Sequence, residues 1–224
     1  MKILYDHQIF SVQVFGGVSR YFIEISNTLR KNNQIYFSVK ISNNFYLNSV
    51  IRNHLSFFRK YDFKGKIRII YFVNKLYSIF ILKKNKFDVF HPTYYDPYFI
   101  KHLGNKKFVL TVYDMIHEKF PEMFSESDKT TSNKKLLVDK AAKIIAISNS
   151  TKEDLIKIFN VNPSKIEVIY LSHSVLEKKG SRTNINFKLP KKYFLYVGSR
   201  NGYKNFIFFL NSIKNILKND SSLN

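Results

Sequence analysis

The chain has 224 residues, of which 45% are hydrophobic and 17% aromatic; this is enough for a sizeable core and excludes a wholly disordered protein. With 37 Lys and Arg against 16 Asp and Glu, the formal net charge is +21, which predicts attraction to anions such as phosphates, acidic lipids or nucleic acid. There is no cysteine, so a disulfide framework, a thiolate metal site and a cysteine nucleophile are excluded, and a cytoplasmic location is expected.

The amino terminus, Met1–Asp6, carries one Lys followed by a short strand-like run and lacks the long apolar stretch of a secretory signal. The most apolar window, Ile67–Leu82, contains Arg68, Asn74 and Lys75 and is shorter than the roughly 20 residues that cross a bilayer. We therefore expect neither export nor a membrane span.

Short apolar runs alternate with amphipathic stretches, which is typical of βα units. This predicts an α/β protein with an open, parallel, Rossmann-like sheet and helices on both faces. The predicted strands are Lys2–Tyr5, Gln34–Ile41, Phe87–His91, Lys107–Tyr113, Lys143–Ile147, Ile166–Tyr170 and Tyr193–Val197.

Two helices carry clear local signals. Apolar residues at three- and four-residue spacing predict a crossover helix that ends near Lys31; they are Val18, Tyr21, Phe22, Ile25 and Leu29. Ser150 and Glu153 have the spacing of a capping box, which predicts a helix from there to Phe159, before Asn162 and Pro163.

Composition divides the chain into three parts. Residues 1–175 form the predicted Rossmann-like domain, and residues 176–191 are polar and indicate a linker. Residues 192–224 hold one more βα unit, with a loop at Gly198–Asn205 and a helix at Phe206–Leu217. One such unit cannot bury both of its faces. It either docks on the first domain or opens a second, incomplete α/β domain.

In an open parallel sheet, ligands bind beyond the carboxyl ends of the strands. Gly16 and Gly17 lie there, just before a helix whose amino terminus offers amides and a positive dipole to a phosphate. A plain tight turn is the alternative, since the fuller dinucleotide fingerprint is absent.

A second candidate for a diphosphate site lies near the end of the chain. Arg200 and Lys204 stand in a glycine-containing turn whose two cations are suited to hold a diphosphate. A solvated basic turn is the alternative.

Further polar residues follow the third, fourth and fifth predicted strands. His91 and Tyr94 are candidates to line the cleft, while Asp114 and His117 are spaced to bind sugar hydroxyls and handle a proton. Either His alone is also typical of a polar residue that caps a loop. The run Ser148–Ser150 is expected mainly to form the cap of the following helix, with its amides, including that of the cleft candidate Ser148, facing the same cleft. No metal-ligand cluster is found in the sequence.

The segment Arg59–Lys86 carries nine cations and one acidic residue, Asp62, interleaved with Phe and Ile. Two interpretations remain open. Such a segment can lie on an anionic membrane surface. It can equally be a crossover helix with an apolar core face and a solvated face. Basic residues elsewhere are spread along the chain without a recognition motif, so no specific nucleic-acid partner is expected.

Taken together, these residues resemble the family 4 retaining glycosyltransferases of the two-domain GT-B fold. The resemblance is carried by Lys2–Asp6 with Gly16–Tyr21, Asp88–Tyr94, Thr111–Glu118 with Phe120–Glu122, Ala146–Ser150 with Asp154–Leu155, and Tyr196–Arg200 with Lys204–Asn205. It implies transfer of a hexosyl group from a nucleotide-diphosphate sugar to a glycan or lipid-linked acceptor in surface-polysaccharide synthesis, without a metal or other cofactor, in the cytoplasm or at the inner membrane face.

By this resemblance Gly16 and Gly17 face the donor diphosphate, while Arg200 and Lys204 grip it and stabilise the leaving group. Many relatives carry His where Tyr113 stands, so the acceptor-side role passes to His117, beside Asp114.

The family's Glu-x7-Glu motif is missing from the sequence. The resemblance therefore implies a truncated enzyme with little or no activity on its own. The alternative is a non-catalytic module derived from a glycosyltransferase that binds a membrane or a partner.

Overall fold

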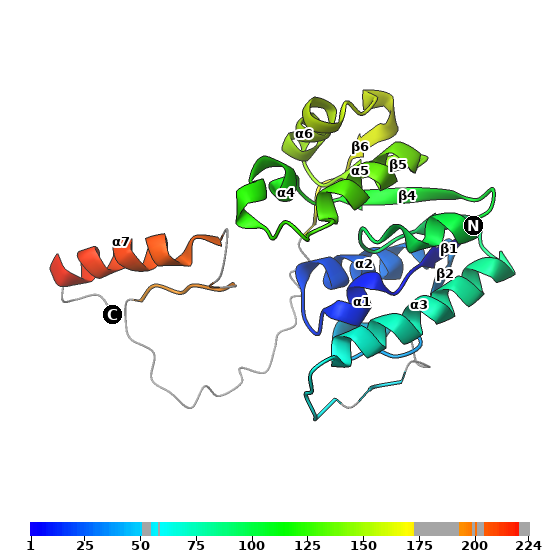
Figure 1. Cartoon of the computed structure of the whole chain (residues 1–224), viewed down its shortest axis with the longest axis horizontal. Coiled ribbons are helices and arrows are strands. Elements are labelled where there is room, and N and C mark those ends of the chain that lie inside the picture. Colours follow the sequence, from blue (N-terminus) through cyan, green and yellow to red (C-terminus); the bar gives the residue numbers. More distant parts are fainter. Residues whose placement is uncertain (51–54, 58, 173–192, 199, 201–203, 220–224) are drawn as a thin grey trace. The chain divides into compact units, whose positions relative to one another are not determined.

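The computed structural model describes all residues except 51–54, 58, 173–192, 199, 201–203 and 220–224. The chain forms two compact units, Met1–Leu171 and Ser172–Asn224 (Figure 1). The predicted linker, 176–191, lies outside the described residues.

The first unit is built on a parallel sheet in the order β2-β1-β3-β4-β5-β6, which confirms the predicted fold class. The strands are β1 (Lys2–Tyr5), β2 (Gln34–Phe37), β3 (Val89–His91), β4 (Lys107–Val112), β5 (Lys143–Ala146) and β6 (Ile166–Val168). All but β1 are shorter than predicted: β3 begins two residues later, and the others end earlier, where backbone pairing stops. Tyr5 is level with Phe37 on one side and with His91 on the other.

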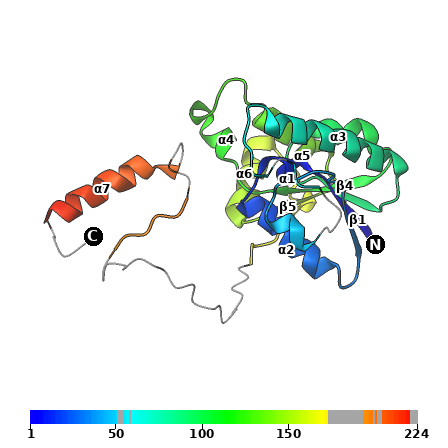
Figure 2. The ribbon, with the colours of Figure 1, turned by 90° about the horizontal axis from the view of Figure 1, so that it is seen from below.

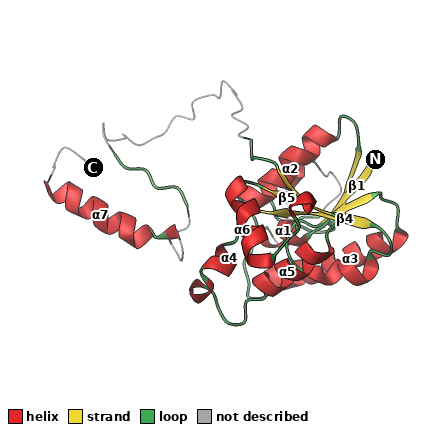
Figure 3. Ribbon diagram, turned by 90° about the horizontal axis from the view of Figure 1, so that it is seen from above, coloured by secondary structure: helices red, strands yellow, loops and turns green. Residues whose placement is uncertain are grey.

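Helices cover both faces of this sheet; α2 and α3 lie on opposite sides of it (Figures 2 and 3). The α-helices of the first unit are α1 (Gln8–Val12), α2 (Gly17–Leu29), α3 (Lys66–Lys84), α4 (Ile116–Lys119), α5 (Thr130–Lys140) and α6 (Asn149–Phe159). Short 3-10 turns are η1 (Tyr46–Ser49), η2 (Pro97–His102), η3 (Pro121–Met123) and η4 (Pro163–Lys165).

Two core clusters follow from the alternation of side chains along β1. Leu4 points into one cluster, which includes Leu137 of α5 and Leu155 of α6. Ile3 and Tyr5 point into the other. Because successive residues of a strand face opposite sides, three residues of β1 serve both layers of helices, while Lys2 is exposed.

The crossover helix α2 is confirmed, with one difference in its apolar face. Phe22 is fully buried, but Leu29 is exposed at the last turn, while Ile23 is buried instead. The helix ends at Leu29, two residues before the predicted Lys31.

The start of α6 differs from the predicted capping box. Ser148, not Ser150, is the N-cap, and its Oγ accepts a hydrogen bond from the amide of Thr151 (3.1 Å). Of the run Ser148–Ser150 that is expected to cap this helix, only Ser148 does so, whereas Ser150 already lies inside the helix. The strand β5 ends at Ala146 and the helix begins at Asn149, so Ser150 is already in its first turn.

In the second unit, α7 (Phe206–Asn219) confirms the predicted helix. The predicted strand at Tyr193–Val197 is wrong: these residues form no strand. A strand needs a neighbour to accept and donate its backbone hydrogen bonds, and no second strand occurs among the described residues of this unit.

None of the helices in the described part of the chain has the length and apolar character needed to span a membrane.

Candidate functional site

The carboxyl edge of the sheet has its reversal of strand order between β1 and β3. The chain moves outward from β1 to β2 and then returns to place β3 on the other side of β1. Ligands of open parallel sheets bind at such a reversal, because the loops leaving the two strands diverge there. The candidate site is therefore the set of residues that follow these strand ends.

The carboxylate of Asp6, directly after β1, ties the two strand ends together. It accepts hydrogen bonds from the amide of Thr93 (2.8 Å), the hydroxyl of Thr93 (2.7 Å), Nε2 of Gln8 (2.8 Å) and the hydroxyl of Tyr98 (3.1 Å). Burial raises the pKa of Asp6 despite these hydrogen bonds, which act in the opposite direction. Asp6 therefore joins Gln8, Thr93 and Tyr98 in one buried hydrogen-bond network at the carboxyl edge.

This network extends to α3 through Asp96. The amide of Asp96 donates to Oε1 of Gln8 (2.7 Å), and Nε2 of Gln8 donates back to the carbonyl of Asp96 (3.0 Å). The carboxylate of Asp96 accepts from the hydroxyl of Tyr71 (2.7 Å) and from Nζ of Lys75 (3.3 Å). Since Tyr71 and Lys75 belong to α3, the first half of that helix is fastened to the carboxyl edge.

Gly16 and Gly17 stand at the amino terminus of α2, as predicted, and they differ in surroundings. A Cβ on Gly16 would overlap the carboxamide of Gln13, whose Oε1 accepts a hydrogen bond from the amide of Ser19 (3.3 Å). A Cβ on Gly17 would meet no atom within 4 Å. Packing within the first unit therefore explains Gly16, whereas Gly17 faces open space.

His91 is buried below the edge. Its Nε2 is hydrogen-bonded to Oγ1 of Thr111 (2.9 Å), which in turn contacts the hydroxyl of Tyr21 (3.3 Å). Burial lowers the pKa of His91 to about 3, so the ring is neutral at physiological pH. Its surroundings are those of a core residue that supports the edge from beneath.

Two tyrosines lie between the two core clusters at the same edge, Tyr94 and Tyr113. The Tyr94 ring packs on Tyr95, with centroids 4.7 Å apart. Burial raises the pKa of Tyr113 well above its usual value, so its hydroxyl stays protonated. That hydroxyl is buried and has no hydrogen-bond partner in the described part of the chain.

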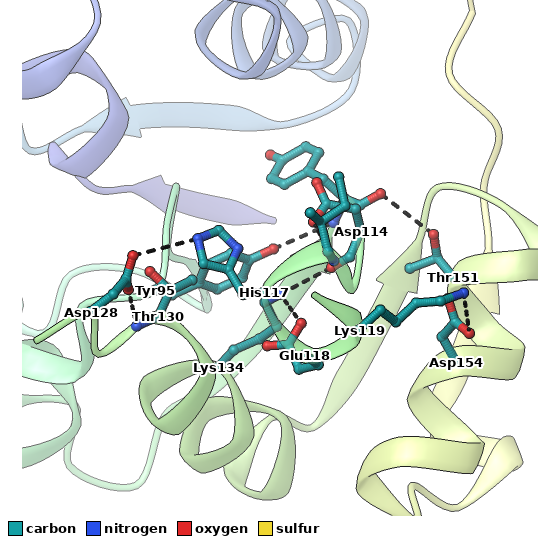
Figure 4. Close-up of polar contacts among 12 residues, drawn as sticks. Tyr95, Asp114, His117, Glu118, Lys119, Asp128, Thr130, Lys134, Thr151 and Asp154 are labelled. Atoms are coloured by element: carbon teal, nitrogen blue, oxygen red, sulfur yellow. Dashed lines mark hydrogen bonds and ion pairs between the residues drawn. The ribbon is translucent and has the colours of Figure 1, made fainter. Parts of the chain in front are cut away.

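Asp114 and His117 share the loop after β4 but point to different partners. Oδ1 of Asp114 accepts from the amide of Ile116 (3.1 Å). Figure 4 shows the His117 side chain directed toward Asp128, with Nε2 and Oδ2 3.6 Å apart. The His117 ring also stacks on Phe124 at 3.8 Å between centroids. These contacts hold His117 against the loop before α5.

The same loop is anchored by a buried ion pair that is not among the sequence predictions. Nζ of Lys134 lies 2.8 Å from Oε2 of Glu118, and both side chains are about 1% exposed (Figure 4). Lys134 also donates to the carbonyl of Asp114 (3.0 Å). A signal existed in the sequence, because Lys134 shares a helical face with Leu137 and Val138 at three- and four-residue spacing.

Ser148 completes this edge at the end of β5. Its hydroxyl lies 3.0 Å from Oγ1 of Thr151, and Oγ1 of Thr151 donates to the carbonyl of Tyr113 (3.4 Å). The helix cap is therefore linked to the loop that carries Asp114.

Arg200 and Lys204 belong to the second unit, on either side of residues 201–203, which are not described. The guanidinium carbon of Arg200 lies 5.3 Å from the ring centroid of Phe206, at the start of α7. Among the described residues of the whole chain, no group of three or more His, Asp or Glu side chains is arranged to hold a metal ion.

The model of Glycosyltransferase Family 4 matches residues 15–172, which include Gly17 and the carboxyl ends of β3, β4 and β5. The chain belongs to glycosyltransferase family 4. A search of curated proteins finds no match.

A solved glycosyltransferase structure shares the fold of this family member. Anabaena Alr3699/HepE, solved in complex with UDP and glucose, has 16% identity and a TM-score of 0.50; the alignment covers 77% of this chain and 45% of HepE. A glycosyltransferase from Rickettsia africae ESF-5 has 21% identity and a TM-score of 0.43, covering 75% of this chain and 42% of its own. The chain thus spans less than half the length of these structures.

Proposed function

We propose that this family 4 chain takes part in transferring a hexosyl group from a nucleotide-diphosphate sugar to a glycan or lipid-linked acceptor in surface-polysaccharide synthesis. The observation that carries the proposal is Gly17, which begins α2 at the carboxyl edge and faces open space. Amides and the dipole at a helix amino terminus favour a diphosphate there.

In this proposal each predicted site residue keeps its role. Gly16 and Gly17 are proposed to contact the donor diphosphate, and Arg200 and Lys204 to neutralise its charge. Charge that grows on the departing diphosphate is then stabilised by cations and amides of the protein. Asp114 and His117 serve the acceptor, with Asp114 accepting a hydrogen bond from its hydroxyl. His91, Tyr94 and Ser148 line or support the edge.

We further propose that the chain works in the cytoplasm, at the inner face of the membrane. The support is the charge of the segment 59–86, which can be drawn to anionic lipid. A non-catalytic module that only binds membrane or a partner is the competing hypothesis, favoured by the apolar side chains that α3 exposes.

Release of nucleoside diphosphate from a panel of UDP, GDP and ADP sugars tests the transferase proposal, with lipid-linked glycans as acceptors. It is best run on the longest reading frame that contains this sequence. We expect acceptor-dependent release that Gly17→Val and the double variant Arg200→Ala, Lys204→Ala each reduce by more than about tenfold. A matched double variant, Lys152→Ala with Lys157→Ala on α6, should react like the wild type. No release with any donor would overturn the proposal in favour of the non-catalytic module.

A further inference from the structure

The helix α3 buries polar side chains and exposes large apolar ones, the opposite of a typical amphipathic helix on a protein surface. Its inward-facing positions include two buried polar residues, Asn74 and Ser78, beside Ile70 and Leu82. Outward, at spacings of three and four residues, it presents Ile69, Phe72, Leu76 and Phe80, which are 43%, 61%, 54% and 53% exposed. We call these four side chains the outer stripe. The buried Ile70 and Leu82 agree with the apolar core face of the crossover-helix interpretation, but the outward side of the helix is not a solvated polar face.

Hydrogen bonds explain how α3 is held without burying the outer stripe. Oδ1 of Asn74 accepts from the amides of Lys40 (2.9 Å) and Ile41 (3.0 Å), and its Nδ2 donates to the carbonyl of Ile41 (2.7 Å). The hydroxyl of Ser78 is bonded to the hydroxyls of Ser38 (2.7 Å) and Tyr98 (2.6 Å). Hydrogen bonds from the inner face therefore help to hold α3 on the first unit, and the side chains of the outer stripe are not needed for the core.

Cations border the outer stripe. Arg68 lies at one edge of it, and Lys83 and Lys84 lie at its carboxyl end, all exposed. Nζ of Lys84 is 4.2 Å from the ring centroid of Phe80. The helix itself contains five basic residues and no acidic one. An apolar strip bordered by cations is complementary to a bilayer interface with anionic headgroups, where both kinds of side chain find partners at once.

We infer that the outer stripe and its bordering cations form the surface by which this chain docks on an anionic lipid bilayer. The inference rests on, and deepens, the membrane part of the proposed function by naming the face. It also gives the acceptor a location, because Tyr71 and Lys75 fasten the first half of α3 to Asp96 at the carboxyl edge. A lipid-linked acceptor in the same bilayer would then lie beside that edge.

Co-sedimentation of the full chain with phosphatidylcholine vesicles, with and without phosphatidylglycerol, tests the surface. We expect binding to the anionic vesicles only. The triple variant Phe72→Ser, Leu76→Ser, Phe80→Ser should weaken it by about 100-fold or more, since each side chain loses burial in lipid. Arg68→Gln, Lys83→Gln, Lys84→Gln should weaken it by about 100-fold through lost headgroup attraction.

A matched control comes from α7, where Ile207, Phe208 and Leu210 are 63%, 68% and 47% exposed. Their triple substitution by Ser should leave vesicle binding as in the wild type. If this control weakens binding as much as the α3 triple, or if the α3 triple binds normally, the inference is wrong. A wild-type dimer that the α3 triple converts to a monomer, with no vesicle binding by either, would assign the face to a second copy instead.

A second readout does not depend on removing apolar side chains. The chain has no Trp, so Phe72→Trp introduces a single reporter and Phe208→Trp a matched one. We expect a blue shift and quenching by brominated anionic lipid for Phe72→Trp alone. Equal or absent responses would overturn the inference. Both readouts need no nucleotide sugar, so a failure of the transferase proposal leaves them intact, and the reverse also holds.

Discussion

Nζ of Lys134 and Oε2 of Glu118 lie 2.8 Å apart in a place where both side chains are about 1% exposed. Lys134 also reaches the carbonyl of Asp114 (3.0 Å) and lies over the Tyr95 ring, 5.2 Å from its centroid. One ammonium thus joins α5, the loop after β4 and the loop after β3.

Removing one partner of this pair leaves a buried charge without compensation. We expect Lys134→Met to lower the free energy of unfolding by about 3–5 kcal/mol, measured by urea denaturation. The double variant Lys134→Met, Glu118→Leu should recover much of this loss, because no lone charge remains. The neighbouring Lys135 is exposed, and Lys135→Met should change stability by less than about 0.5 kcal/mol. Equal losses of stability for Lys134→Met and Lys135→Met would contradict a stabilising role of the buried ion pair.

Two histidines make the stability of the first unit depend on pH. Burial lowers the pKa of His7 and of His91 to about 3. The unfolded chain therefore binds more protons than the folded one between pH about 3 and about 6.5, and stability falls as pH falls through that window. At pH about 5 each His should cost about 2 kcal/mol relative to neutral pH.

Urea denaturation over a pH series measures this effect. His91→Gln should flatten the pH dependence. Thr111→Val removes the hydrogen-bond partner of His91 (2.9 Å) but keeps the ring, so it should lower stability while the slope with pH persists. A His91→Gln profile as steep as that of the wild type would disprove the assignment.

Substitution by Ala should affect protein stability differently at Gly16 and at Gly17, the two glycines at the amino terminus of α2. Gly17→Ala leaves stability unchanged or raises it by up to about 1 kcal/mol, because its Cβ meets no atom and Ala favours a helix. Gly16→Ala should lower stability, because its Cβ displaces the Gln13 carboxamide. Thermal unfolding measures both.

Binding of nucleoside diphosphates separates the same two positions by function. By the proposed function, Gly17→Val should weaken binding of UDP, GDP or ADP by roughly tenfold or more in calorimetry, since the side chain fills the donor's space. Affinity equal to that of the wild type would show that the open space at Gly17 is not where the donor lies.

The two serines at the start of α6 provide an internal comparison. Ser148→Ala should cost about 1 kcal/mol, the usual loss for an N-cap whose hydroxyl accepts from an amide of the first turn. Ser150→Ala lies within the helix and should have little effect or a slightly stabilising one. Denaturant midpoints of the two variants check this. A larger loss of stability for Ser150→Ala than for Ser148→Ala would favour Ser150 as the N-cap, as the capping box predicts.

Several features of the fold could be predicted because the local pattern and the tertiary environment agree. The run Lys2–Tyr5 is a strand in both, since its apolar side chains fill both core layers. Tyr193–Val197 has the same pattern but is not a strand, because pairing depends on a neighbour that no local pattern supplies.

The site was harder to predict, because burial decides what a polar side chain does. His91 is predicted to line the cleft from its place at the end of a strand, and only the fold shows that its ring is buried against Thr111. Asp6 and Lys134 attracted no prediction, although their long-range bonds to Thr93 and Glu118 shape the edge. Such pairings join residues far apart in the chain, so spacing alone does not show them.

The hydrogen bonds of Asn74 have a consequence for the orientation of the whole first unit. They go to the backbone of Lys40 and Ile41, so α3 cannot roll about its own axis without breaking three of them together. A helix held only by apolar contacts could slip by one side chain at small cost. Here the angle between the outer stripe and the sheet is locked, and any flat surface that α3 rests on meets the strands at one fixed inclination.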